Sequence, residues 1–182
     1  AQRRGIAWES PVSAELIRPE DNGGFAVDCG IRIQGGGYVR PQYNPNSGLP
    51  FSKYSFRLYF RGDYGAGRLE YPLFGDIPVQ SFDRIVLRAG MNDHTSPFIK
   101  DEWARRLCSN LGQVSPRGNF VNLYINGKYK GYYNPTERID TKFLADWYQT
   151  DENYDVIAQF NEIRSGSAVA WNKMLNYVRR YD

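Results

Sequence analysis

Cysteine and histidine are scarce in this sequence, and each scarcity excludes a class of site. The 182 residues include two cysteines, Cys29 and Cys108, and one histidine, His94. Two cysteines cannot form a disulfide framework, and because each lies in an apolar row we expect two buried free thiols. A single histidine cannot by itself build a metal site or a protease triad, so we expect His94 to be a loop residue.

Long apolar runs and dense blocks of one charge are also lacking. No stretch is long and uncharged enough to span a membrane, and the first residues lack the order of a signal peptide. The formal net charge is +3. This balance permits an anionic ligand, but it is far from the basic stripe of a nucleic-acid-binding protein, so we expect no nucleic-acid partner.

Aromatic residues are plentiful, at 15% of the chain, which suits sheets and ligand-stacking surfaces. Apolar residues alternate along 25–33 and 54–60, a pattern typical of half-buried strands. Asn126-Gly127 between two further strand patterns predicts a hairpin with a two-residue turn. The predicted fold class is α+β, a mainly antiparallel twisted sheet with three helices, which we place at 97–111, 137–148 and 168–180.

The first predicted helix has Ile99, Trp103, Leu107 and Leu111 at helical spacing, with Ser96 as its cap. The chain begins without Met and stops straight after a helical pattern. We therefore expect residues 1–182 to be one domain fragment excised from a longer protein. Such a fragment is expected to expose an apolar or aromatic surface.

A glycine run joins the two alternating strands. Gly35, Gly36 and Gly37 follow the first strand, and Lys53 precedes the second. Consecutive glycines let a backbone approach a ligand closely, as in many phosphate cradles, and a lysine entering the next strand would reach the same phosphates. From these residues alone, a plain turn with Lys53 as an ordinary solvated cation is the favoured interpretation.

The ordered pieces together resemble the CotH family of atypical, secreted or coat-associated protein kinases, which use ATP and a divalent metal. The matching residues run in family order from about residue 25 to 144. They are Gly30-Ile31-Arg32-Ile33-Gln34-Gly35 with Gly36 and Gly37, Lys53 with Ser55-Phe56-Arg57-Leu58, Tyr71-Pro72-Leu73-Phe74, Phe82-Asp83, Val86-Leu87-Arg88, Asn92-Asp93, Asp101 with Leu107, Leu123-Tyr124-Ile125-Asn126-Gly127 with Tyr129, Gly131 and Tyr133, and Glu137-Arg138-Ile139-Asp140. The tail around Ala170-Trp171-Asn172 resembles the bacterial branch of the family.

Two departures from the family pattern concern the chemistry. The family usually has proline before the lysine and often a second basic residue after it, where this chain has Ser52 and Tyr54. The aspartates that the family uses as catalytic base and metal ligand belong to a later segment around a Trp-Asp motif, and nothing in this chain matches it. The resemblance therefore implies the N-terminal, nucleotide-binding portion of a kinase that is inactive alone.

The resemblance also implies the site residues. A kinase clamps phosphates with a glycine loop and a lysine, and a carboxylate fixes the lysine. We expect Lys53 and Glu137 in these catalytic roles, with Asp101 as the alternative partner of Lys53. The alternative interpretation of Glu137 is an acid at a helix N-terminus, and that of Asp101 is a support for its own helix. The expected nucleotide-binding residues are Gly35, Gly36, Gly37, Arg40, Lys53, Arg57 and Asp101.

Cofactors, partners and location follow from the same resemblance. It implies ATP with Mg or Mn for the full-length protein, and we place no metal ligand in this fragment. The implied partners are a Ser/Thr-rich coat or surface protein as substrate and the remaining C-terminal half of the same polypeptide. The implied location is extracellular, at the cell surface or on the spore coat.

Two other function classes remain open. One is a noncatalytic scaffold or adhesin-type module that binds carbohydrate or a surface partner. Its stacking faces would come from Tyr38, Tyr43, Tyr59 and Tyr64. The other is a platform for single-stranded nucleic acid, which needs a basic groove and is disfavoured by the net charge of +3.

Overall fold

The computed structural model describes residues 5–36, 40–48, 51–94 and 97–180. The chain divides into two compact units, Ala1–Arg138 and Ile139–Asp182. Both helices and antiparallel strands are present, so the predicted α+β class is confirmed. Among the described residues, no helix combines the length and the apolar character needed to cross a membrane. That residues 1–182 form one fragment of a larger kinase domain stays a prediction.

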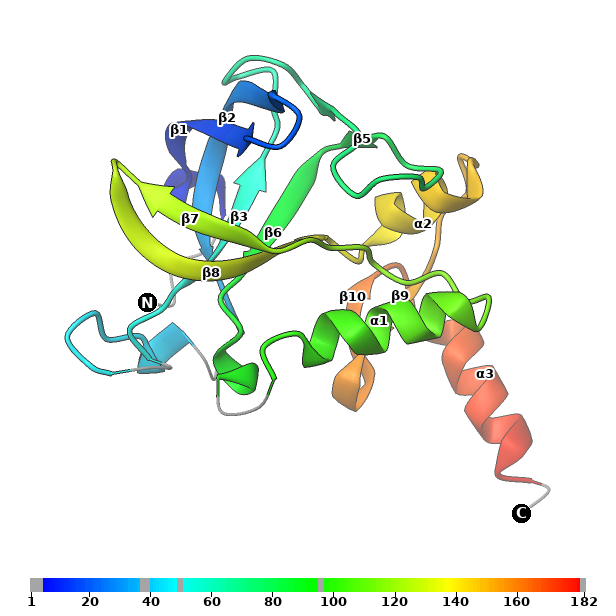
Figure 1. Ribbon diagram of the computed structural model, residues 1–182. Helices are drawn as coiled ribbons and strands as arrows, with labels where there is room; N and C mark the ends of the chain where they lie inside the picture. The colour runs from blue at the N-terminus through cyan, green and yellow to red at the C-terminus, as the bar shows by residue number, and fades with distance from the viewer. Residues whose placement is uncertain (1–4, 37–39, 49–50, 95–96, 181–182) are drawn as a thin grey trace. The chain divides into compact units, whose positions relative to one another are not determined.

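A curled antiparallel sheet of six strands dominates the first unit (Figure 1). Its strand order is β1-β2-β3-β6-β8-β7, and every neighbouring pair is antiparallel. The strands are β1 (Ser10–Arg18), β2 (Gly23–Gln34), β3 (Ser55–Tyr59), β6 (Arg84–Arg88), β7 (Val121–Ile125) and β8 (Lys128–Glu137). The end of β2, which leads into the glycine run, lies beside the start of β3, because Gln34 pairs with Ser55.

Side-chain alternation gives this sheet one apolar and one polar face. Leu58 of β3 lies opposite Ile31 of β2 and Ile85 of β6, and these side chains share the apolar face. Arg57 lies opposite Arg32 and Val86 on the polar face. On the apolar face Ile85 is 1% exposed and Cys29 is fully buried. Both cysteines are free, as predicted, although Cys108 is only half-buried.

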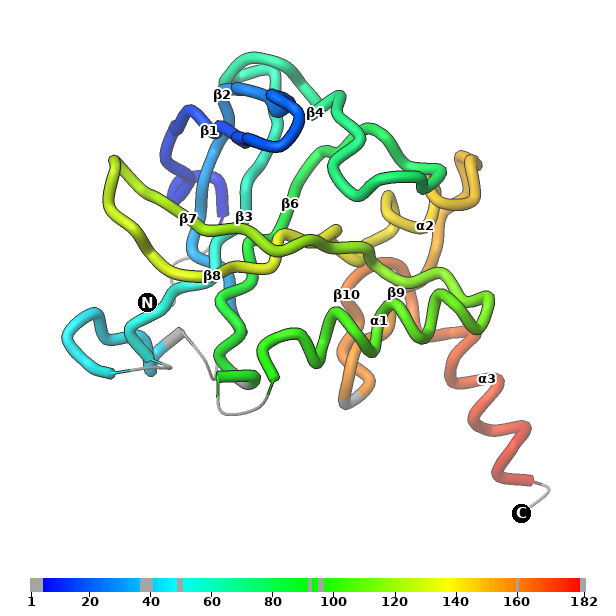
Figure 2. The backbone as a smooth tube through the Cα atoms, in the orientation of Figure 1, coloured from blue at the N-terminus to red at the C-terminus, as the bar shows by residue number. Residues whose placement is uncertain are grey.

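The segment between β3 and β6 also supplies core. It contains the small ladder of β4 (Leu69–Glu70) and β5 (Ser81–Phe82), and Figure 2 shows its path from β3 back to β6. Its buried apolar residues are Phe60, Leu69, Leu73, Ile77, Val79 and Phe82. The two neighbouring strands β3 and β6 are thus joined by a segment that is itself part of the packed interior.

The β7–β8 hairpin forms at the predicted place. Ile125 pairs with Lys128, and the two turn residues Asn126 and Gly127 both have positive φ, 50° and 72°. A two-residue turn with positive φ at both positions matches the right-handed twist of the flanking strands, and Asn-Gly is the pair that best tolerates it.

The first helix, α1 (Lys100–Asn110), begins three residues later than predicted. Its predicted cap, Ser96, lies outside the described residues. More importantly, its apolar stripe does not face the sheet, because Ile99, Trp103 and Leu111 are 53%, 61% and 72% exposed. The buried residue of this helix is Glu102, at 2% exposure.

The second unit consists of two helices and a two-stranded sheet. They are α2 (Thr141–Tyr148), β9 (Val156–Ala158), β10 (Glu162–Ser165) and α3 (Val169–Val178). The predicted helix start at 137 is wrong, since Glu137 is the last residue of β8. The helix cap is Asp140, whose side chain accepts a hydrogen bond of 3.1 Å from the Phe143 amide.

Candidate functional site at the glycine end of the sheet

The glycines after β2 and Lys53 before β3 lie at the same end of the sheet. Gln34, the last residue of β2, pairs with Ser55, the first of β3. The ladder between the two strands ends at this pair, and Gly35 beyond it has φ 155°, so Gly36 and Lys53 share this end of the sheet without being register partners. A Cβ built on Gly36 would meet no atom within 4 Å, so this backbone borders open space. Gly37 and the side chain of Arg40, two of the predicted ligands, lie outside the described part of the chain.

Lys53 lies among aromatic rings. Its Nζ is 4.8 Å from the centroid of the Phe98 ring and 4.5 Å from that of Tyr133, and it donates a hydrogen bond to the Tyr132 carbonyl. Burial lowers the pKa of Lys53. These contacts are cation–π interactions and a neutral hydrogen bond. Among the residues that the structure describes, the partners of this ammonium are thus aromatic rings and a carbonyl and not an acid.

Glu137, the predicted partner of Lys53, is held elsewhere. It pairs with Ile85 of β6, which pairs with Leu58 of β3, five residues beyond Lys53. Its carboxylate accepts a 2.8 Å hydrogen bond from the Arg117 amide, and the residue is 6% exposed. The register thus places Glu137 further along the sheet than Lys53, and its role in orienting the lysine stays a prediction.

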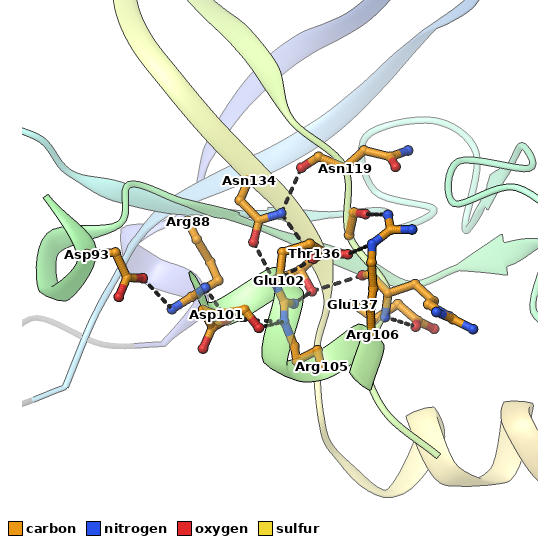
Figure 3. Close-up of polar contacts among 12 residues, drawn as sticks. Arg88, Asp93, Asp101, Glu102, Arg105, Arg106, Asn119, Asn134, Thr136 and Glu137 are labelled. Atoms are coloured by element: carbon orange, nitrogen blue, oxygen red, sulfur yellow. Dashed lines mark hydrogen bonds and ion pairs between the residues drawn. The ribbon is translucent and has the colours of Figure 1, made fainter. Parts of the chain in front are cut away.

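Asp101, the alternative partner, binds arginines. It forms ion pairs with Arg88, at the end of β6, and with Arg105 Nε at 3.1 Å (Figure 3). Asp93 nearby is 4% exposed and lies 3.3 Å from Lys100 Nζ. The ion pairs of Asp101 thus connect α1 with the end of β6, and its pairing with Lys53 stays a prediction.

A polar cluster attaches α1 to β8 (Figure 3). Its buried members are Glu102, Asn134 and Thr136, and the half-buried Arg105 and the exposed Arg106 complete it. Glu102 accepts hydrogen bonds from Arg105 Nη2 at 2.7 Å and from Arg106 Nε at 2.8 Å. Arg105 also donates to the side chains of Thr136 and Asn134. We call this group the α1–β8 polar cluster.

Gly118 lets a third segment reach this cluster. A Cβ on it would lie 2.5 Å from Glu102 Oε2 and 2.7 Å from the Pro135 carbonyl oxygen, so a larger residue does not fit. The α1–β8 polar cluster was not predicted from the sequence. The signal that would have found it is the spacing of Glu102, Arg105 and Arg106 at i, i+3 and i+4, which makes a charged stripe as regular as the apolar one.

A second group of charges lies on the polar face of β2 and β3. Arg32, Arg57 and Arg61 surround the Tyr59 ring, with their Cζ atoms 4.0, 5.6 and 5.0 Å from its centroid. We call these three residues the Tyr59 arginine cluster. Burial, then the charge of Arg138, lowers the pKa of Arg57 to about 10.

Alternation extended back from 54–60 would put Lys53 on the same face as Arg57, but the contacts place the two side chains on different sides of the sheet. Tyr133, whose ring lies under the Lys53 ammonium, stacks on Phe56 of the apolar face at 6.2 Å. Arg57 instead donates to the side chains of Gln34 and Tyr59 on the polar face. The physical reason is that Lys53 precedes β3, where the strand's alternation does not fix its direction.

The tyrosines expected as stacking faces are partly used inside the protein. Tyr59 is 5% exposed, and the Tyr43 ring packs on Tyr54 with centroids 4.5 Å apart. The Tyr43 hydroxyl donates to the Gln34 carbonyl at 3.1 Å. Tyr38 lies outside the described residues. The larger exposed aromatic surface is on the β7–β8 hairpin, where Tyr124 and Tyr129 are 60% and 57% exposed.

The donor set at the glycine end fits phosphate groups better than a bare metal ion. Open glycine backbone and an ammonium are ligands for anions. Within the described residues, no group of three or more His, Cys, Asp or Glu side chains is placed to hold a metal ion.

Comparison with known proteins gives one family. No curated protein matches the chain. The family model described as CotH kinase protein matches residues 31–177, a range that includes the glycine end, Lys53 and the α1–β8 polar cluster. This match covers most of the 182 residues, and the chain therefore belongs to the CotH kinase family.

Proposed function

We propose that this chain is the nucleotide-binding portion of a CotH-family protein kinase, and that the ATP phosphates bind at the glycine end of β2. Family membership by itself suggests a kinase-like or spore-coat protein. The observation that supports the finer proposal is the pairing of Gln34 with Ser55, which puts the end of β2 that leads into Gly35 and Gly36 and the start of β3 that follows Lys53 at the same end of the sheet. A phosphate held by the glycine backbone would lie within the range of this lysine.

The residues of this chain bind and orient rather than react. The Gly35 and Gly36 amides would hold phosphate oxygens, and Lys53 would exchange the Tyr132 carbonyl for a phosphate oxygen, which is the stronger, charge-assisted acceptor. The lowered pKa of Lys53 reflects a desolvated ammonium that gains from such an anionic partner. ATP with Mg or Mn supplies the transferable phosphoryl group. The catalytic aspartates are proposed to come from the remainder of the polypeptide, and residues 1–182 alone are proposed to be inactive.

Nucleotide titration tests this proposal directly. A fluorescent ATP analogue with Mg is titrated into the chain and into Lys53→Ala, with Lys128→Ala in the exposed hairpin turn as the matched lysine control. We expect Lys53→Ala to weaken binding at least about tenfold and the control to leave it unchanged. Equal affinity of Lys53→Ala and wild type would remove the lysine from the site.

Phosphotransfer by the full-length protein extends the test. Lys53→Ala is expected to abolish or strongly weaken transfer, and Lys53→Arg to fail as well, because a planar guanidinium does not replace a compact ammonium in a tight phosphate site. Glu137→Gln should reduce the rate less than Lys53→Ala, as its proposed role is orientation alone. Self-phosphorylation by residues 1–182 at the full-length rate would contradict the proposed division of the site.

A second candidate function is a noncatalytic binding module, and the exposed hairpin favours it. Tyr124 and Tyr129 lie with ring centroids 5.2 Å apart, and Tyr132 on the same hairpin is 46% exposed. Exposed aromatic rings stack well on sugar rings. Binding of a glycan panel that is lost in Tyr124→Ala and kept in Lys53→Ala would favour this function over the kinase proposal.

A further inference from the structure

The Tyr59 arginine cluster has more positive than negative charge around one ring. Arg32 and Arg61 both form ion pairs with Glu9, at 3.2 and 2.9 Å, and the Glu9 side chain is fully buried. Arg57 has hydrogen bonds to Tyr59 and Gln34, both neutral groups, and no carboxylate partner among the described residues. Three guanidinium groups and one carboxylate leave two positive charges here.

These guanidinium groups also have unused donors. The Nε atoms of Arg57 and Arg32 are buried without a hydrogen-bond partner, since the contact between Arg32 and Glu9 has the distance of an ion pair but not the geometry of a hydrogen bond. A buried hydrogen-bond donor without an acceptor lowers the stability of the fold, more so on a charged group. Charged groups in such unfavourable surroundings are frequent at functional sites. The Tyr59 arginine cluster therefore lacks both negative charge and hydrogen-bond acceptor atoms.

We propose that the Tyr59 arginine cluster binds a phosphoryl dianion, at a site separate from the glycine end of β2. A dianion balances the two excess charges, whereas a single carboxylate leaves one. Tetrahedral phosphate oxygens match the planar fork of arginine, and the buried Nε donors supply additional hydrogen bonds. The Arg61 side chain is 38% exposed and that of Arg32 17%, so the cluster remains open to a ligand.

The inference goes beyond the proposed ATP site because its residues lie on the other face of the sheet. Arg57 contacts Gln34 and Tyr59 on the polar face, while Lys53 contacts Tyr133, which belongs to the apolar face. The phosphoryl group has two possible sources, the nucleotide or a phosphorylated side chain of a protein. Both present the same dianion, and the experiment separates them.

Inorganic phosphate is the first probe. It is titrated by calorimetry into the whole chain at constant ionic strength, because screening by added salt would otherwise alter the affinity. We expect saturable binding that is weakened about tenfold or more in Arg57→Gln and several-fold in Arg61→Gln. Arg164→Gln, which removes the same charge from a surface pair with Glu162 in the second unit, is the matched control and should bind like wild type.

Two further variants make the test specific. Glu9→Gln removes the competing negative charge, so phosphate is expected to bind several-fold more tightly; a structural role for the arginines alone predicts no tightening. Lys53→Ala is expected to keep the phosphate affinity of wild type while losing ATP at the glycine end. This contrast separates failure of the ATP proposal from failure of the present one.

The outcomes are decisive in both directions. Absence of saturable phosphate binding by wild type overturns the proposal, as does equal binding by wild type, Arg61→Gln and Glu9→Gln. If Arg57→Gln does not fold, Arg61→Gln and Glu9→Gln still decide it. Competition by phosphoserine but not by ATP assigns the site to a phosphorylated side chain, and competition by ATP that persists in Lys53→Ala assigns it to the nucleotide.

Discussion

Arg32 and Arg57 lie directly opposite each other on β2 and β3, although both are positively charged. Like charges in directly opposed positions destabilise a sheet. Glu9, which pairs with Arg32 and with Arg61, is the acid that offsets this repulsion. The sheet at this point therefore depends on a residue that precedes β1 in the chain.

Glu9→Ala tests that dependence. Removing a buried carboxylate leaves three arginines around Tyr59 without their acid, and we expect the free energy of unfolding to fall by about 2 kcal/mol or more. Urea denaturation followed by tryptophan fluorescence measures the change. Because the excess charge is what destabilises, added phosphate should restore more stability to this variant than to wild type. Unchanged stability would mean that solvent, rather than Glu9, screens the arginines.

Glu137 is expected to matter for stability through its hydrogen bond to the Arg117 amide. Glu137→Ala leaves that amide unsatisfied in a buried position and should cost about 1–3 kcal/mol. Glu137→Gln retains a carbonyl oxygen as acceptor and should cost less than about 1 kcal/mol. Chemical denaturation compares the two variants; equal costs would show that the charge of Glu137, and not its acceptor atom, is what stabilises.

The α1–β8 polar cluster should be intolerant of losing its one acid. Glu102→Ala leaves Arg105 and Arg106 without the carboxylate that both bind, and a loss of about 3–5 kcal/mol in unfolding free energy is expected for a buried pair broken from one side. The control is Glu162→Gln, from the surface pair with Arg164, which should change stability by less than about 0.5 kcal/mol. If Glu102→Ala lost no more unfolding free energy than Glu162→Gln, the result would contradict the attachment of α1 to β8 through this cluster.

Trp103, although the largest apolar residue of α1, should contribute little to stability of the isolated chain. At 61% exposure, its replacement in Trp103→Gln is expected to change the unfolding free energy by less than about 1 kcal/mol. Ile85→Ala, at 1% exposure on the apolar face of the sheet, should cost about 2–5 kcal/mol. Thermal and urea unfolding give both values, and a large loss in Trp103→Gln would mean that the apolar stripe of α1 is covered.

Cys29 is expected to make the free energy of unfolding depend on pH in the alkaline range. Burial raises the pKa of the Cys29 thiol to about 11, above its unfolded value near 9. Between these values the unfolded chain loses its proton and the folded chain keeps it, so stability is fully present below about pH 9 and falls as the pH rises towards 11. Wild type should lose about 1–2 kcal/mol more than Cys29→Ala between pH 8.5 and 10.5. Parallel pH profiles of the two proteins would argue against a shifted thiol.

The strands were the most predictable part of the fold, because alternation reports burial directly. The pattern of Phe56 and Leu58 against Arg57 gave both the strand and its two faces. The helix predicted from 137 failed because Pro135 and the acid after it are also signals of a helix start. Contacts with residues distant in the sequence hold this segment extended. Gly118 forms an antiparallel β-bridge with Thr136, and the Asn119 amide donates a hydrogen bond of 3.0 Å to the Pro135 carbonyl.

The face that α1 turns toward the sheet could not be predicted from the local sequence pattern. Two regular stripes run along this helix, one apolar through Trp103 and one charged through Glu102 and Arg105, and periodicity alone does not say which of them faces the sheet. The choice is made by Asn134 and Thr136 on the polar face of β8, about thirty residues away in the chain. Trp103 on this helix is 61% exposed, and the expectation that a fragment exposes an aromatic surface stays a prediction.

The position of Lys53 was the least predictable part of the site. The pairing of Gln34 with Ser55 puts Gly36 and Lys53 at the same end of the sheet, and their joint role in binding phosphate stays a prediction. The aromatic surroundings of the lysine come from Phe98 and Tyr133, which no local motif connects to it. Such contacts depend on the strand order β3-β6-β8, and strand order is not encoded in the alternation of any one strand.

The segment that joins β3 to β6 sets a limit on how the length of this chain can vary. Connections between neighbouring antiparallel strands usually tolerate shortening, because a tight turn can replace them. Here the connection contributes Leu69, Leu73, Ile77, Val79 and Phe82 to the interior. A deletion between β3 and β6 would remove core together with surface, whereas the exposed tip at Asn126-Gly127 contributes no buried side chain. Length changes within the first unit are therefore better accommodated at the β7–β8 hairpin than between β3 and β6.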